Sequence, residues 1–252
     1  MSLAALEREP LTEVVFGVGF DPSNFTSVHY GLYWQTIRND FPSDPLDRPP
    51  LGEIELLRAL PPLRRVWFES EDKNQLIQLQ SDRFYYNWRR QPSTTKYPHY
   101  EDIYPKFLKE WARFQDWWLK EFSSPMQSNR YELTYLNQID ERFGWKEAKD
   151  HQNIFNIISE SWNKLPLQID GFRGDIKFIL PQERGDLVVS IDEGANPTGG
   201  SPFVVLNLTA RSNDTDIDIE QWFGSAHESI VETFASLLSQ KSKEQWGFQW
   251  LK

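Results

Sequence analysis

The sequence predicts an α+β protein in which helices pack on antiparallel sheets. Three short runs between Arg64 and Arg90 alternate apolar and polar residues as β-strands do, and they follow one another closely enough to pair as hairpins. A separate stretch from Tyr100 to Phe122 places aromatic and aliphatic residues at the three- and four-residue spacing of an amphipathic helix. Strands that cluster in this way, with helices between the clusters, are typical of α+β folds.

The first half of the chain predicts the order βαβββαβ. A strand over 13–20 precedes turn residues and a helix whose apolar residues recur at helical spacing from Tyr30 to Phe41. Prolines crowd the stretch 42–62, which we interpret as a surface excursion with at most one helical turn, near 53–57. The later elements are three strands, the long helix and one more strand: RRVWFES, QLIQLQ, DRFYYNWRR, residues 100–122 and RYELTYLNQID.

The second half repeats part of this order as αβββα. A helix near 154–162 precedes three strands and a final helix, which we place at 172–180, 187–192, 203–211 and 222–238. The two halves share an order of elements but no repeat of residues. We therefore predict two pseudo-equivalent halves, 1–142 and 143–252, each with an antiparallel sheet and helices, packed as one unit.

Composition limits the classes of function. The formal net charge of −10 argues against general binding to nucleic acids, because a phosphate-backbone binder needs a dense cationic surface. A basic protein partner would be attracted to such a chain. No apolar run reaches the length of a membrane helix, and the first residues do not form a signal peptide, so we expect a cytoplasmic protein without membrane contact. The absence of cysteine excludes disulfides, thiolate nucleophiles and cysteine-based metal sites.

Three stretches approach known motifs without completing them. His227 and the Glu after it lack the second His of a zinc-binding helix, so we interpret His227 as a structural residue of the final helix. The acidic run 214–220 lacks the Gly and Glu that a calcium loop requires, and it favours the start of a helix. GANPTGG at 194–200 lacks the Lys of a phosphate-binding loop and predicts a hairpin loop. We therefore predict neither a metal nor a cofactor.

The strand DRFYYNWRR offers the strongest candidate surface. Phe84, Tyr86 and Trp88 fall on one side of the pleat, which we assign to the core. The opposite side, together with the preceding strand, gives the candidate partner-binding residues Gln78, Gln80, Arg83, Tyr85, Asn87 and Arg89. Glu132 and Thr134 of a later strand extend this face. Arginine and aromatic residues are enriched at protein-binding hot spots, although the same pattern also describes the solvent face of an antiparallel sheet.

Several segments resemble one sporadically distributed prokaryotic family that has no assigned activity. These segments are PLTEVVFGVGF at Pro10, RRVWFES at Arg64, LIQLQSDRFYYNWRR at Leu76, YPHYEDIYPKF at Tyr97 and ELTYLNQID at Glu132. The resemblance covers at least residues 10–140. It implies a place in defence-associated gene neighbourhoods, and it supplies no catalytic residues.

The favoured hypothesis is a non-enzymatic protein-recognition or regulatory component of a prokaryotic defence or toxin-control system. The alternative is a small-molecule or nucleotide-binding enzyme with its site between the sheets, where Arg83 or Arg89 binds an anion and His227 acts as the base. Binding of single-stranded nucleic acid by stacking on Tyr85 and Arg89 is disfavoured by the acidic composition. A deep apolar pocket would support the enzyme, and a flat patch with aromatic residues at its rim would support the recognition protein.

Overall fold

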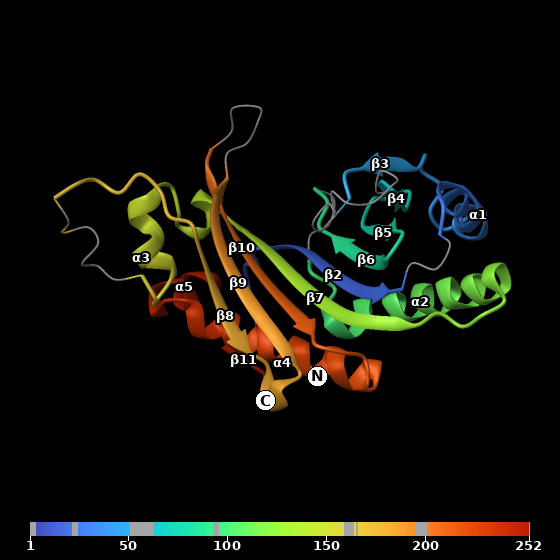
Figure 1. Ribbon diagram of the computed structural model, residues 1–252. Helices are drawn as coiled ribbons and strands as arrows, with labels where there is room; N and C mark the ends of the chain where they lie inside the picture. The colour runs from blue at the N-terminus through green and yellow to red at the C-terminus, as the bar shows by residue number, and fades with distance from the viewer. Residues whose placement is uncertain are drawn as a thin grey trace. The chain divides into compact units, whose positions relative to one another are not determined.

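The computed structural model describes residues 4–21, 25–50, 63–92, 96–158, 164, 166–194 and 201–251. These residues form an α+β fold, which confirms the predicted class (Figure 1). In chain order the elements are β1 (Ala4–Ala5), β2 (Leu11–Phe20), α1 (Ser27–Ile37), β3 (Leu46–Arg48), β4 (Arg65–Glu69), β5 (Gln75–Gln80), β6 (Arg83–Arg89), α2 (Tyr100–Phe122), β7 (Ser128–Ile139), α3 (His151–Ile154), β8 (Gly174–Ile179), β9 (Gly185–Gly194), β10 (Phe203–Ser212), α4 (Ile219–Leu237), α5 (Gln240–Trp246) and β11 (Gln249–Trp250). Short 3₁₀ turns cover Glu141–Phe143, Ala148–Asp150 and Pro181–Glu183.

The described strands form one large and one small sheet. The large sheet has the order β3-β4-β5-β6-β2-β7-β10-β9-β8, and β1 pairs with β11 in the small sheet. Every pair with a defined register is antiparallel. Whereas the sequence predicts a sheet for each half, the strands of both halves follow one another in this single order. Alternation fixes the faces of a strand but not its neighbours, so the central places of β2 and β7 were not predictable.

The chain divides into two compact units. One unit comprises Val15–Glu132 with Asp214–Asp216, and we call it the N-unit. The other comprises Met1–Val14, Leu133–Asn213 and Ile217–Lys252, and we call it the C-unit. The division falls inside β2 and β7, whereas the sequence places a boundary after residue 142. A strand has none of the composition of a linker, so its sequence gives no sign of such a division.

Aromatic residues hold helix α2 against the sheet of the N-unit. Phe16 and Phe20 of β2 lie 5.1 Å and 5.6 Å, between ring centroids, from Phe107 and Phe114 of α2. Phe84 of β6 stacks on Phe114 at 5.0 Å. The even-numbered residues of β2 and β6 therefore face the helix, and their odd-numbered residues face the opposite side of the sheet. The core side predicted for β6 is confirmed.

The C-unit packs helix α4 on strand β10. Asp218 begins this helix, because its carboxylate accepts hydrogen bonds from the backbone N–H groups of Glu220 and Gln221 at 2.9 Å and 3.1 Å. The acidic run therefore starts a helix, as predicted. Both elements carry buried apolar side chains, which include Trp222, Phe223, Ala226 and Ile230 of α4 and Leu206 and Leu208 of β10.

The prediction of a helix near 154–162 is wrong for residues 155–158, which are the described residues after Ile154. Helix α3 ends at Ile154, and Phe155 is extended and forms a β-bridge with Leu238. Phe155 is fully buried in this extended conformation, so its apolar side chain does not require a helix in order to be buried. Residues 159–163, the helical turn expected near 53–57 and most of the loop expected at 194–200 lie outside the described residues.

Candidate functional site

The side of the N-unit sheet opposite α2 carries polar residues from five strands. The register places Trp67 of β4 opposite Gln78 of β5, and Gln78 opposite Tyr85 of β6. Arg48 of β3 stands opposite Arg65 of β4 in the same way. We call this side the polar face; it comprises the even-numbered residues of β3, β5 and the N-unit part of β7, and the odd-numbered residues of β4, β6 and the N-unit part of β2.

Three arginines surround one indole on the polar face. The guanidinium carbons of Arg48, Arg65 and Arg89 lie 4.4 Å, 5.4 Å and 5.5 Å from the centre of the Trp67 ring. These distances are within the range of cation–π attraction, which orients each guanidinium on the ring. We call Arg48, Arg65, Trp67 and Arg89 the arginine–tryptophan cluster.

Gln78 joins this cluster to the next strand. Its Oε1 accepts hydrogen bonds from Arg65 Nη1 at 2.6 Å and from Trp67 Nε1 at 3.0 Å. Its Nε2 donates to Asn87 Oδ1 at 2.9 Å. Gln78 and Asn87 are only 6% and 1% exposed, so a buried polar network fixes the position of the indole and the guanidinium groups.

The charges of the three cluster arginines are balanced to different degrees. Arg89 forms an ion pair with Glu69, whose side chain is buried beside it. Arg65 donates one of its hydrogen bonds to the amide oxygen of Gln78. Within the described part of the chain, Arg48 has no ion pair, and its guanidinium donates only to the backbone carbonyl of Asp47 at 3.3 Å. Arg48, which is half-buried, is therefore the cluster residue best placed to take an incoming anion.

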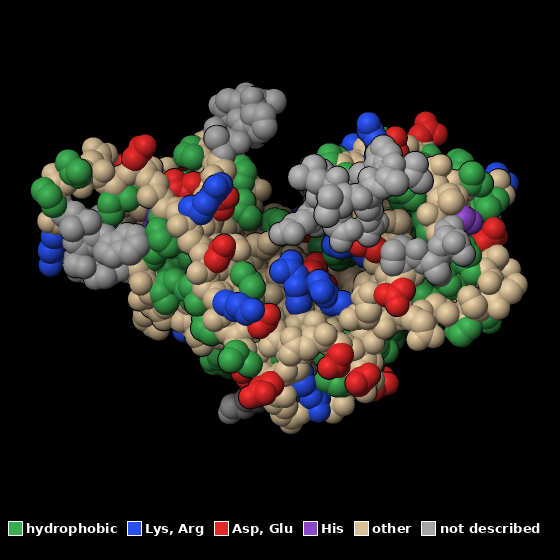
Figure 2. Space-filling model, in the orientation of Figure 1, with side chains coloured by type: hydrophobic (Ala, Val, Ile, Leu, Met, Phe, Trp, Pro, Cys, Tyr) green, Lys and Arg blue, Asp and Glu red, His purple; other side chains and the backbone are tan. Residues whose placement is uncertain are grey.

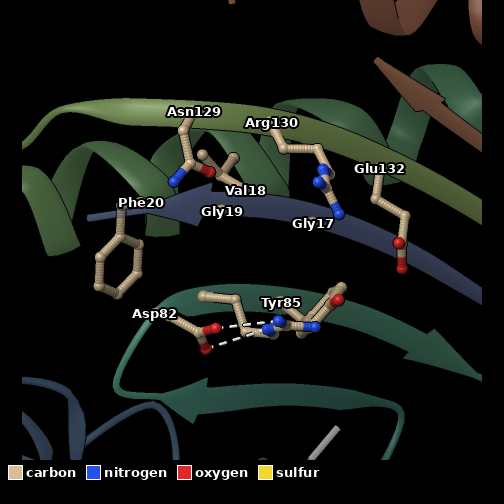
Figure 3. Close-up of a pocket in the computed structure, with 10 residues that line it drawn as sticks. Gly17, Val18, Gly19, Phe20, Asp82, Tyr85, Asn129, Arg130 and Glu132 are labelled. Carbon is tan, nitrogen blue, oxygen red and sulfur yellow. Dashed lines mark hydrogen bonds and ion pairs between the residues drawn. The ribbon is translucent and has the colours of Figure 1, made fainter. Parts of the chain in front are cut away.

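Two glycines of β2 open a cavity beside this network. Gly17 and Gly19 present no side chain to the polar face, and the cavity above them has a volume of about 220 Å³. Asp82, Arg83 and Tyr85 line it from the β6 side, and Asn129, Arg130 and Glu132 line it from β7 (Figure 3). We call this cavity the glycine furrow.

Charged groups in the glycine furrow are mostly engaged with one another. Arg83 donates to both carboxylate oxygens of Asp82, at 3.0 Å and 2.9 Å, and this hydrogen bonding raises the pKa of Arg83. Burial and the nearby Glu132 raise the pKa of Tyr85 to about 12, so its hydroxyl stays protonated at neutral pH. Arg130 extends from β7 over β2 and is exposed, and it forms no ion pair with a described residue (Figure 3).

The six predicted partner-binding residues lie on this one face, but most of them are not accessible. Gln78, Gln80, Tyr85 and Asn87 are buried, which corrects the expectation that the whole face is available for contact. The amides are covered because they hydrogen-bond to neighbouring side chains. The side chains of Arg83 and Arg89 remain 26% and 17% exposed. Partner binding by these six residues stays a prediction.

The polar face is locally cationic although the chain is acidic. Its arginines are Arg48, Arg65, Arg83, Arg89 and Arg130, and the carboxylates beside them are Asp82, Glu69 and Glu132. Among the described residues, these five cations exceed the three anions by two, in a chain whose formal net charge is −10. Figure 2 shows Lys and Arg side chains, in blue, gathered near the middle of the view beside Asp and Glu side chains in red.

The proposed catalytic base belongs to the other unit. His227 lies in α4 of the C-unit, is 7% exposed, and its Nδ1 is 2.8 Å from the hydroxyl of Tyr135. This environment fits the structural role predicted for it. Among the described residues, no group of three or more His, Asp or Glu side chains is placed to hold a metal ion.

Sequence reasoning missed half of the site. Arg48 lies in β3, a strand inside the stretch 42–62 that the sequence predicted to be a surface excursion, so that prediction is wrong at Leu46–Arg48. Arg65 and Trp67 lie on a predicted strand that was not connected to the candidate surface, and Arg130 was predicted only as a strand residue. A usable signal was present in β2, where Gly17 and Gly19 stand two residues apart in a strand. Glycine inside a strand often marks a place where something must approach the backbone closely.

Comparisons with protein-family models and with curated proteins find no match. The resemblance to a sporadic prokaryotic family therefore stays a prediction from the sequence segments. In the described part of the chain, no helix combines the length and apolar character needed to cross a bilayer.

Proposed function

We propose that this protein is a non-enzymatic recognition protein whose polar face binds an acidic segment of a partner protein. The observation that carries the proposal is the gathering of five arginines on one sheet face of an acidic chain, three of them around Trp67. Following the sequence resemblance, we further propose that it acts in the cytoplasm as a regulatory component of a defence or toxin-control system.

The arginine–tryptophan cluster has the chemistry of a carboxylate site. Guanidinium groups bind carboxylates through two parallel hydrogen bonds and lose little hydration when they do so. Stacking on Trp67 and bonding to Gln78 hold the guanidinium of Arg65 in place before any partner arrives. Preorganised charges of this kind lose less conformational entropy on binding than flexible ones. An acidic segment is thus the partner that these groups favour.

The local charge of the site favours an acidic partner over a basic one. The net charge of the whole chain would attract a basic protein, as the sequence alone suggested. At contact, however, charges within about 10 Å dominate at physiological salt, because more distant ones are screened. The polar face carries an excess of arginine over carboxylate, so its complement at short range is acidic.

The enzyme alternative has less support from the site. The glycine furrow, about 220 Å³ in volume, lies below the range of roughly 300–1,000 Å³ that is usual for small-molecule sites. Its lining is charged and polar, whereas the alternative calls for a deep apolar pocket. His227, the suggested base, is 7% exposed, and its Nδ1 lies 2.8 Å from the Tyr135 hydroxyl.

The nucleic-acid alternative also has little support. Stacking of bases requires an aromatic ring that is open to solvent. Tyr85, the residue suggested for this role, is 6% exposed, and Trp67 already carries guanidinium groups against its ring. A polar face with three carboxylates among its cations is also a poor surface for a continuous phosphate backbone.

Charge reversal at Arg48 is the sharpest test of this proposal. Arg89 is a poor choice, because its removal would leave the buried carboxylate of Glu69 without its cation. Arg48 is half-buried and has no ion pair within the described residues, so Arg48→Glu should leave the fold intact. Arg38→Glu provides the matched control, since Arg38 is exposed just after α1 and lies outside the polar face.

Tagged wild-type, Arg48→Glu and Arg38→Glu proteins would be purified from the native host at low and high salt, and bound proteins identified by mass spectrometry. The proposal expects a stoichiometric protein that Arg48→Glu loses, Arg38→Glu retains and high salt releases. Its binding region, mapped by truncation, should be rich in Asp and Glu. Retention of the partner by Arg48→Glu, or a basic binding region, would refute the proposal.

A further inference from the structure

A different part of the molecule, the edge strand β8 of the C-unit, carries an independent inference. We propose that β8 is a self-association site, at which the β8 strands of two copies of this chain pair antiparallel and extend the sheet from one copy into the other. The inference does not depend on the function proposed for the polar face.

Strand β8 has the features of an open sheet edge. It stands last in the strand order and pairs with β9 alone among the described strands. The backbone N–H and C=O groups on the side of β8 away from β9 therefore have no strand partner among the described residues. A row of unpaired backbone groups at a sheet edge can pair with another strand. Phe178 and Ile179 are 39% and 75% exposed, so neither side of the strand is fully covered near its end.

The exposed apolar surface of β8 continues the core of the C-unit. Ile176 and Phe178 stand opposite Val189 and Leu187 of β9, which are fully buried or nearly so. Ile176 is half-buried and Phe178 is 39% exposed, and no further strand lies beyond β8 among the described residues. A second β8 strand would cover these side chains: in an antiparallel pair centred on Ile176, Ile176 stands opposite Ile176 and Phe178 stands opposite Gly174.

The charges of β8 select a second copy as the occupant. In an antiparallel pair centred on Ile176, Asp175 of one copy stands opposite Lys177 of the other, and the same contact occurs twice by symmetry. Oppositely charged residues at facing positions stabilise a strand pair, and like charges destabilise it. A strand of one charge sign would satisfy Asp175 or Lys177 but not both. The sequence of β8 is thus its own complement.

The neighbouring ion pair is compatible with this contact. Lys177 Nζ lies 2.7 Å from Asp186 Oδ2 of β9, and the side chains of Lys177 and Asp186 are 63% and 36% exposed. An ammonium group has three N–H donors, so the contact with Asp186 leaves donors for the carboxylate of a second copy. A surface ion pair of this exposure contributes little to folding, so its alteration does not threaten the C-unit.

The register of the proposed pair gives a test with complementary variants. Asp175→Lys places Lys opposite Lys in a homodimer, and Lys177→Asp places Asp opposite Asp. Each variant alone should self-associate about tenfold more weakly than the wild type, because both symmetric contacts become repulsive. A mixture of the two variants restores both attractive pairs. Size-exclusion chromatography with light scattering would measure the mass of each sample across a range of concentrations.

The expected results are a wild-type dimer, two weakened single variants and a heterodimer in their mixture. Heterodimer formation also shows that both variants are folded. A monomeric wild type at every concentration would overturn the proposal. Undiminished association of the single variants, or a mixture that stays monomeric, would overturn it as well, because either result excludes the register centred on Ile176.

Discussion

Replacing Gln78 by Leu tests whether the buried network holds the polar face together. Leu has nearly the volume of Gln but neither donates nor accepts hydrogen bonds. The variant removes the bonds from Arg65 and Trp67 to Gln78 Oε1 and the bond from Gln78 Nε2 to Asn87. All three arise inside the N-unit, where Gln78 itself is 6% exposed. The expected result is a clear loss of stability.

The size of this loss follows from the three bonds. Each hydrogen bond contributes on average about 1 kcal/mol net, and loss of a partner for a buried group costs about 1–3 kcal/mol. Arg65 is half-buried, so water can replace part of its bond, and the added Leu methyl groups recover some apolar burial. We therefore expect the free energy of unfolding to fall by about 3 kcal/mol. For a chain of this size the melting temperature would fall by about 6–12 °C.

Urea unfolding followed by tryptophan fluorescence would measure this change. The matched control is Gln35→Leu on α1, because Gln35 is exposed in the same unit. Its free energy of unfolding should change by less than about 0.5 kcal/mol. A loss below about 1 kcal/mol for Gln78→Leu would refute the reasoning, since it would mean that the amide makes no net contribution at this position.

Three further predictions concern the same unit. The pKa of Tyr85 is raised from 10.0 to about 12 in the folded protein, so unfolded chains lose this proton first. The contribution of Tyr85 to stability should be complete below pH 10 and decline by up to about 3 kcal/mol as the pH rises to 12, so the decline with pH should be smaller in Tyr85→Phe than in the wild type when unfolding is measured at each pH. Gly17→Ala should cost about 1–3 kcal/mol in urea unfolding, because its Cβ would lie 2.6 Å from Tyr85 Cδ1. Gly19→Ala should cost less, because the one close contact of its Cβ is with the end of the exposed Asn129 side chain, at 2.6 Å, while Arg130 Cβ lies at an ordinary contact distance of 3.4 Å. Equal losses would contradict this account. Phe114→Ala should cost about 3–5 kcal/mol, because this fully buried ring contacts others on three elements; a loss near 1 kcal/mol would show that the cluster does not stabilise the unit.

Periodicity predicted the elements that have one apolar side. The bounds of α2 were predicted exactly as they occur because its stripe of large side chains has one consistent spacing from Tyr100 to Phe122. The core side of β6 was equally clear, because Phe84, Tyr86 and Trp88 are all buried. Such patterns report on a single element and its own burial.

The composition of the site depended on strand neighbours, which periodicity does not specify. Trp67 was visible in its strand, but only the register with β5 shows that its Nε1 reaches Gln78. Arg130 and Gly17 share the glycine furrow because β7 and β2 are adjacent, although the two residues are far apart in sequence. Partner strands are selected by contacts over the whole fold, and no local pattern records them.

The expectation of an exposed polar face failed for a related reason. Gln78 and Asn87 have polar side chains, and an alternating strand normally turns these to water. Here Gln78 bonds to Asn87, Arg65 and Trp67, so these two amides can be buried with hydrogen-bond partners. A polar residue in an alternating strand therefore indicates which side of the strand lies opposite the core, but it does not show that the residue itself is exposed to solvent.

The most direct measurement of the central claim is the affinity of the polar face for an acidic peptide. Fluorescence anisotropy would follow a labelled peptide of alternating Glu and Gly, with a Lys and Gly peptide of equal length as the reference. The account predicts that the wild type and Arg38→Glu bind the acidic peptide and not the basic one, that Arg48→Glu binds it about tenfold more weakly, and that salt weakens binding. Equal binding of both peptides, or an unchanged affinity in Arg48→Glu, would contradict recognition of acidic segments by the arginine–tryptophan cluster.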